Sequence, residues 1–170
     1  MHWDERIQRT IFWKVLLKTL RFLMILSTVL VTVILGVVVL FRYVLYKNFI
    51  GYEEFVLVGA FWMYFIGAAY SSFRETEIKA DFLAVFVSKK TSLIVSLISK
   101  IIQVILGIPL VILAVQMLLF DLEFNPVTVI WKIPLLVPQS AILIGYLLML
   151  LFSIVYLSRD IRKYKAGIYE

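Results

Sequence analysis

Side chains able to carry out chemistry are scarce in this sequence. The 170 residues include no cysteine, and the single histidine, His2, lies next to the N-terminus. Thiolate nucleophiles, cysteine-based zinc sites and two-histidine metal sites therefore cannot form within one chain. An internal histidine base for proton transfer is missing as well. We expect neither catalysis nor a bound cofactor or metal ion.

A pair of acids is the first candidate for a functional group. Glu53 and Glu54 stand directly before a long uncharged run that starts at Phe55. Acids in or beside a membrane can form a proton relay or a cation site. Carboxylates at a helix N-terminus are also favoured by the helix dipole and are commonly solvated there. We interpret the pair as a solvated helix end or a docking point, not as transport chemistry.

A lysine between uncharged segments is the second candidate. Nine uncharged residues, 91–99, precede Lys100 and 20 follow it. A span starting at Thr91 would be about 45 Å long at 1.5 Å per residue, longer than a bilayer core requires. We therefore expect the span to begin near Lys100, whose ammonium group would extend to the lipid headgroups. The alternative is an intramembrane ion pair with the carboxylate of a partner protein.

The composition excludes most soluble proteins. Apolar residues make up 63% of the chain, charged residues 16%, and the mean hydropathy is +1.00. Soluble domains average about 45–50% apolar and about 25% charged residues. The net charge of +6 could suggest nucleic acid, but the basic residues lie between apolar runs. This pattern indicates contact with a lipid bilayer and no nucleic-acid partner.

Long uncharged runs predict the elements that must position these residues. Runs 22–41, 55–73, 101–120 and 133–158 contain 20, 19, 20 and 26 residues, against about 20 needed for a membrane helix. Pro134 and Pro138 should set the start of the fourth span, which we place at 135–158, because proline is tolerated best in a first helical turn. Helices are required because hydrocarbon cannot hydrogen-bond a free backbone. We predict an all-α integral membrane protein, one domain over 1–170, without a buried ionisable pair.

The distribution of basic residues predicts the orientation. The N-terminal tail, the second connection and the C-terminal tail together hold thirteen Lys and Arg residues, and the first and third connections hold three. Loops rich in Lys and Arg stay in the cytoplasm. Both termini should therefore be cytoplasmic.

The first two connections have the composition of interfacial helices. Segment 42–54 mixes four aromatic residues with charges, which favours the headgroup layer and predicts a short helix there. Segment 75–90, projected as a helix, places Phe82 and Phe86 on an apolar stripe and Asp81 on the opposite edge. We expect this second helix to lie between lipid and a partner, or alternatively to contact lipid alone.

Small residues on the second span could allow another helix to approach closely. Gly67 with Ser71, and Ala68 with Ser72, stand four positions apart. Such steps favour helix contact in lipid, either within this chain or with a partner.

Several of these features together resemble one transporter family. Tyr52, Glu53 and Glu54 precede the second span. Near its end stands the segment Gly67-Ala68-Ala69-Tyr70, followed by Arg74 and by the segment Ile78-Lys79-Ala80-Asp81-Phe82-Leu83. This order is similar to that of the small, DctQ-type membrane subunit of tripartite ATP-independent periplasmic (TRAP) transporters. The sequence departs from the family pattern at Tyr52, Glu77 and Ala80, where Trp, His and Val are common.

The resemblance implies a location and partners. Such a protein lies in a bacterial or archaeal cytoplasmic (inner) membrane, pairs with a large multi-span subunit and works with an extracytoplasmic solute-binding protein. The large subunit would hold the substrate and sodium sites and take up an organic acid, while the small subunit would brace the scaffold. Our candidates for partner contact are Glu53, Glu54, Gly67, Ala68, Ser71, Arg74, Asp81, Phe82, Phe86 and Lys100.

Three other functions compete with this interpretation. A homodimeric small transporter would need a membrane-embedded carboxylate, which the uncharged runs lack. A membrane enzyme would need clustered acids or a metal site, and by the predicted topology Glu53 and Glu54 lie across the membrane from Glu75, Glu77 and Asp81. An accessory four-helix scaffold subunit of an unrelated complex would have the same physical features.

Overall fold

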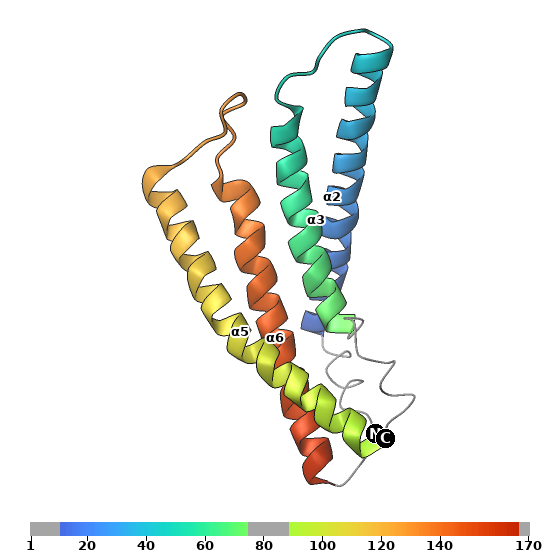
Figure 1. The fold of residues 1–170 in the computed structure, drawn as a ribbon, viewed down its shortest axis with the longest axis vertical. Helices are drawn as coiled ribbons and strands as arrows, with labels where there is room; N and C mark the ends of the chain where they lie inside the picture. The colour runs from blue at the N-terminus through green and yellow to red at the C-terminus, as the bar shows by residue number, and fades with distance from the viewer. Residues whose placement is uncertain (1–10, 75–88, 167–170) are drawn as a thin grey trace.

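Four long helices make up the part of the protein that the structure describes. The computed structural model describes residues 11–74 and 89–166. Within them, α2 (Ile11–Tyr43), α3 (Tyr52–Arg74), α5 (Lys89–Phe124) and α6 (Leu136–Lys165) alternate in direction (Figure 1). Each helix is long and apolar enough to cross a membrane, and the described residues form no strand, only an isolated bridge between Val127 and Pro134. The predicted all-α fold with four spans is confirmed.

The two ends of the molecule differ in what they carry. At one end, α2 begins, α3 ends, α5 begins and α6 ends; we name this the terminal end (Figure 1). The opposite end, the loop end, carries the connection 44–51 and the connection 125–135. The start of α2 and the end of α6 therefore lie on the same side of a membrane. Which side this is stays a prediction.

The third helix is longer than its uncharged run. α5 contains 36 residues, about 54 Å at 1.5 Å per residue, and begins at Lys89. The helix therefore extends well before Lys100, and the expectation that the membrane span within it begins near Lys100 stays a prediction. Figure 1 shows α5 inclined to its neighbours and crossing α6, which accommodates length beyond the bilayer core by tilt. Pro109 lies inside α5, and the helix continues through it.

The first connection is not a helix. α2 continues through Tyr43, residues 45–49 have no helical structure, and α3 begins at Tyr52. Two left-handed residues, Tyr46 at φ 50° and Gly51 at φ 85°, turn the chain back toward α3. The predicted interfacial helix over 42–54 is therefore wrong. The second predicted interfacial segment, 75–90, lies outside the described residues except for Lys89 and Lys90, which begin α5.

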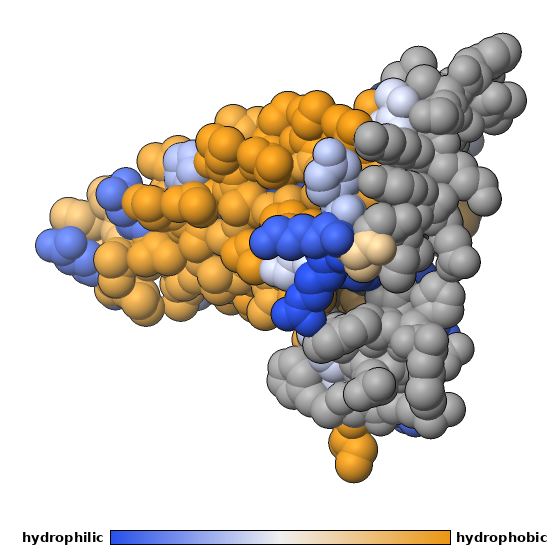
Figure 2. All heavy atoms as spheres, turned by 90° about the horizontal axis from the view of Figure 1, so that it is seen from below, coloured by the Kyte–Doolittle hydropathy of each residue, from blue (hydrophilic) through white to orange (hydrophobic). Residues whose placement is uncertain are grey.

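The helices form a row in the order α2, α3, α6, α5. Contacts join α2 with α3, α3 with α6, and α6 with α5. The central helices α3 and α6 hold most of the buried residues, while α2 and α5 expose apolar side chains along their length. Seen from the terminal end, the flanks are hydrophobic and hydrophilic residues gather beside the atoms drawn in grey (Figure 2). Lipid or a partner must solvate these flanks.

An aromatic core lies near the terminal end. Leu20 of α2, Ile66 and Phe73 of α3, and Phe152 of α6 are its buried members. The Trp13 ring packs 6.0 Å from that of Phe73 and 5.6 Å from that of Phe152. The Tyr156 hydroxyl also donates a hydrogen bond to the Phe73 carbonyl at 2.5 Å. Three helices are thus joined where α3 ends.

Each helix contact in the row is made at a glycine. A Cβ on Gly59 would lie 2.6 Å from Val31 of α2, and one on Gly107 would lie 3.0 Å from Leu150 of α6. At Gly145 of α6 a Cβ would lie 2.8 Å from the Phe65 Cβ and 3.0 Å from the Phe65 carbonyl oxygen. Because backbone blocks this last position, α6 can approach α3 only with glycine there.

Gly145→Ala tests this close approach. The added methyl group meets the α3 backbone, so we expect a loss of stability of about 1–3 kcal/mol, the usual cost of overpacking. Gly36→Ala is the matched control, because nothing lies within 4 Å of its Cβ and alanine favours the helix by about 0.5–1 kcal/mol. Thermal unfolding in detergent compares the two variants. Equal melting temperatures would contradict the assignment.

Candidate functional site

A buried carboxylate holds the loop end together. Glu54, in the first turn of α3, is 8% exposed. Its carboxylate accepts hydrogen bonds from the Thr128 hydroxyl at 2.6 Å, the Ile130 amide at 2.7 Å and the Trp131 amide at 2.8 Å. These donors all belong to the connection between α5 and α6. The start of α3 is therefore fixed to the far pair of helices.

The connection that Glu54 binds is itself ordered by hydrogen bonds. The Thr128 amide donates to the Ile133 carbonyl at 2.9 Å, and the Leu135 amide donates to the Pro126 carbonyl at 2.9 Å. The Thr128 hydroxyl accepts a bond from the Ile133 amide at 2.9 Å while it donates to Glu54. Left-handed conformations at Asn125 and Lys132 close the turn. We name residues 125–135 the hairpin.

Aromatic packing joins the hairpin to the first connection. The Trp131 ring lies 5.3 Å from the Phe55 ring and 6.4 Å from the Phe49 ring, measured between centroids. Gly51 permits this packing, because a Cβ at that position would lie 2.6 Å from the Trp131 Nε1 atom. Only glycine also adopts the φ of 85° at this position without strain.

The two acids in the first turn of α3 have different environments. Glu53 is exposed, as a solvated helix end requires, and remains a candidate for partner contact. Glu54 is buried and satisfied within the chain, so its interpretation as a solvated helix end is wrong, and its role in docking stays a prediction. The sequence could not distinguish the two acids because the partners of Glu54 stand 74 to 77 positions away.

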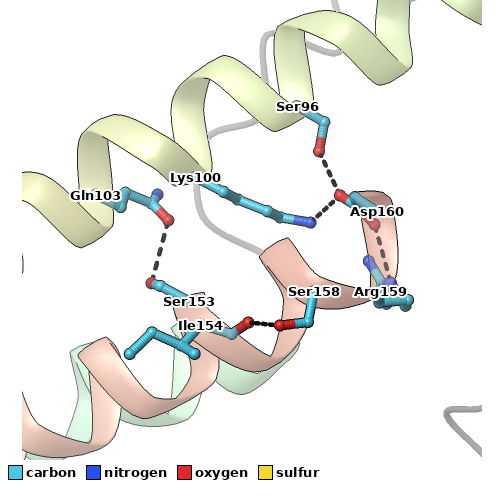
Figure 3. Close-up of polar contacts among 8 residues, drawn as sticks. All are labelled: Ser96, Lys100, Gln103, Ser153, Ile154, Ser158, Arg159 and Asp160. Carbon is cyan, nitrogen blue, oxygen red and sulfur yellow. Dashed lines mark hydrogen bonds and ion pairs between the residues drawn. The ribbon is translucent and has the colours of Figure 1, made fainter. Parts of the chain in front are cut away.

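A second polar cluster, which includes an ion pair, joins α5 to α6 toward the terminal end. The Lys100 ammonium group donates to the Asp160 Oδ2 atom at 2.5 Å, and Asp160 is 3% exposed (Figure 3). Ser96 donates to the same carboxylate oxygen at 3.1 Å, and the Arg159 Nε atom lies 3.0 Å from Oδ1. The Tyr156 ring packs against the Lys100 and Arg159 cations. The carboxylate thus has a donor on each oxygen.

This ion pair contradicts two of our expectations. Lys100 turns inward to α6 instead of extending to the headgroups, and the carboxylate it meets belongs to its own chain. The expected absence of a buried ionisable pair is also wrong. The uncharged runs do not indicate Asp160, because it stands two residues beyond the run 133–158, among the basic residues of the C-terminal tail.

A further buried carboxylate at the loop end has no such compensation. Asp121 of α5 is 2% exposed, and its Oδ2 atom has no hydrogen-bond partner among residues 11–74 and 89–166. The buried Gln139 Oε1 atom in α6 also lacks a donor there. Unpaired buried acceptors are costly. The buried ionic groups are therefore hydrogen-bonded at Lys100 and Asp160, whereas the Asp121 Oδ2 atom is a buried acceptor without a donor in the described residues.

The remaining candidates are distributed along α3 or lie outside the described residues. Ala68 and Arg74 are exposed and Gly67 and Ser71 are half-buried; Gly67 has only the Met24 sulfur near its Cβ position, at 3.9 Å. The close contacts within the chain use Gly59 and Gly145 instead. Asp81, Phe82 and Phe86 lie in 75–88, outside the described residues. Their role in partner contact stays a prediction.

Glu54→Ala should release the hairpin. The Ile130 and Trp131 amides lose their acceptor, so we expect their hydrogen exchange to accelerate by about tenfold, the factor for one such hydrogen bond. Hydrogen exchange followed by mass spectrometry measures this, with Glu53→Ala as the matched control one residue away. Equal exchange in the two variants would argue against the Glu54 contact.

Lys100→Met should destabilise the α5–α6 contact. Breaking a buried pair leaves a charge uncompensated; because Arg159 and Ser96 still face Asp160, we expect about 3 kcal/mol, the lower end for such pairs. The double variant Lys100→Met/Asp160→Leu should recover most of this loss. Thermal unfolding in detergent gives both values, and Lys165→Met, which removes an exposed cation, serves as the control. Failure of the double variant to recover would refute the coupling.

Comparison with known proteins identifies the family of this arrangement. The model of the family described as tripartite ATP-independent periplasmic transporters, DctQ component, matches residues 31–163, which include α3, α5, most of α6 and the last part of α2. A search of curated proteins finds no match. The matched region contains both the Glu54 contact and the Lys100–Asp160 pair. This chain therefore belongs to the DctQ family and is a small membrane subunit of a TRAP transporter.

Proposed function

We propose that this subunit braces the large membrane subunit of its transporter and helps the extracytoplasmic solute-binding protein to dock. The transporter would take up an organic acid together with sodium across a bacterial or archaeal inner membrane. The family match supports a tripartite, ATP-independent transporter. The organic-acid substrate, the coupling to sodium, the inner membrane, the bracing and the docking are part of our proposal.

One observation supports the bracing role: residues of this chain join its helices both at the loop end and toward the terminal end. Glu54 joins α3 to the hairpin at the loop end, and Lys100 joins α5 to Asp160 toward the terminal end. Both carboxylates are occupied in holding helices together and are not available for a moving ion. A subunit built this way suits a static role beside a moving partner.

The loop end is the surface we assign to docking. With cytoplasmic termini, the hairpin faces the extracytoplasmic side. Its Val129 side chain is 85% exposed, and Ile130 and Trp131 are also exposed. Glu54 fixes the backbone beneath them, so a partner meets an ordered apolar surface. Such preorganisation lowers the entropy lost on binding.

Affinity purification of the tagged chain in mild detergent tests the assembly. We expect stoichiometric recovery of a large multi-span membrane protein, identified by mass spectrometry. Recovery of a homodimer alone would contradict the bracing role and favour a stand-alone transporter.

A photo-crosslinking residue at Val129 tests the docking surface. We expect it to capture the solute-binding protein in intact cells, because Val129 protrudes from the hairpin. Val15 is the matched control, since it is 58% exposed at the opposite end. Capture from Val15 in place of Val129 would reverse the assigned orientation.

A further inference from the structure

Two arginines from different helices converge on one tyrosine at the terminal end. Arg21 of α2 donates to the Tyr70 hydroxyl at 3.1 Å, and Arg74 of α3 donates to the same oxygen at 3.2 Å. Both guanidinium groups also face the Tyr70 ring, with centres 5.9 Å and 5.6 Å from its centroid. A neutral phenol thus brings two like charges together.

Neither guanidinium meets a carboxylate within residues 11–74 and 89–166. The two ion pairs described above both belong to Asp160. Arg21 and Arg74 are exposed, and a guanidinium carries five N–H donors, so one bond to Tyr70 leaves most of each fork available. With its oxygen accepting both bonds, the Tyr70 hydroxyl still has its own O–H group to donate. The cluster offers donors and positive charge to an anion.

The depth of the cluster indicates the kind of anion. Arg21 directly precedes the uncharged run 22–41, and Arg74 directly follows the uncharged run 55–73. Both therefore mark the same boundary of the hydrocarbon region, where phospholipid phosphates lie. Lys14 and Lys18, exposed and seven and three residues before Arg21, continue this positive stripe on α2 away from the apolar region.

We propose that Arg21, Tyr70 and Arg74 bind the phosphate group of an anionic phospholipid in the leaflet at the terminal end. Planar guanidinium forks match phosphate oxygens better than a lysine ammonium does. Basic sites between membrane helices at this depth are suited to lipid headgroups. The lipid would bridge α2 and α3 where the aromatic core joins them.

Native mass spectrometry of the purified full chain with short-chain phosphatidylglycerol tests the proposal. We expect Arg21→Gln/Arg74→Gln to bind about tenfold more weakly than the unmodified chain. Lys163→Gln/Lys165→Gln removes the same charge at the same end and should bind normally. Arg21→Lys/Arg74→Lys keeps the charge but loses the forks, and should bind with intermediate affinity. Unchanged melting temperatures show that the variants fold.

Three results would overturn the proposal. Equal phosphatidylglycerol binding by Arg21→Gln/Arg74→Gln would remove these residues from any lipid site. Displacement of the lipid by millimolar inorganic phosphate would assign the site to free phosphate instead. Unchanged lipid binding with loss of a co-purifying membrane protein would assign the arginines to a protein contact. Because the first two results are measured on this chain alone, they do not depend on the bracing role.

Discussion

Lipid gives membrane helices no hydrophobic reason to associate, and the whole fold depends on this constraint. Helices in hydrocarbon adhere through close packing and a few polar contacts. The row satisfies this requirement with one glycine at each contact: Gly59, Gly145 and Gly107. Where the backbones come this near, dispersion contacts replace the driving force that water would supply. The polar contacts are then placed toward the two ends of the helices.

The two polar ties act on different helix pairs. Glu54 spans from α3 to the hairpin, across the centre of the row, whereas the Lys100–Asp160 pair joins α5 to its neighbour α6. Between them, Trp62 of α3 donates to the Val137 carbonyl of α6 at 3.1 Å. The aromatic core adds α2 at the terminal end. Every helix is therefore held by at least one contact that depends on geometry and not on apolar area alone.

The sequence predicts well what depends on local composition. Uncharged runs indicate four helices because hydrocarbon thickness sets a minimum length, and the order of motifs around Tyr70 and Arg74 indicates the family. It fails where a residue depends on distant partners. Glu54 and Glu53 are chemically identical, and only the position of Thr128 and the Ile130 amide separates them. The role of Asp160 likewise depends on Lys100, which stands 60 positions away in the sequence. The segment 42–54 has the composition of an interfacial helix, but Gly51 and Trp131 pack it as a turn.

A single row of helices has mechanical properties that a compact bundle lacks. Sliding of one helix past the next is resisted at every glycine contact, so the row is stiff within its own plane. Bending about the helix axes is opposed by the direct contact of Trp13 with Phe152 at the terminal end of α2, α3 and α6, but elsewhere by one layer of contacts, so the row is more compliant across its plane. A neighbour lying against its broad faces can therefore change its curvature. The same chain can be rigid within the plane of the row and flexible across that plane.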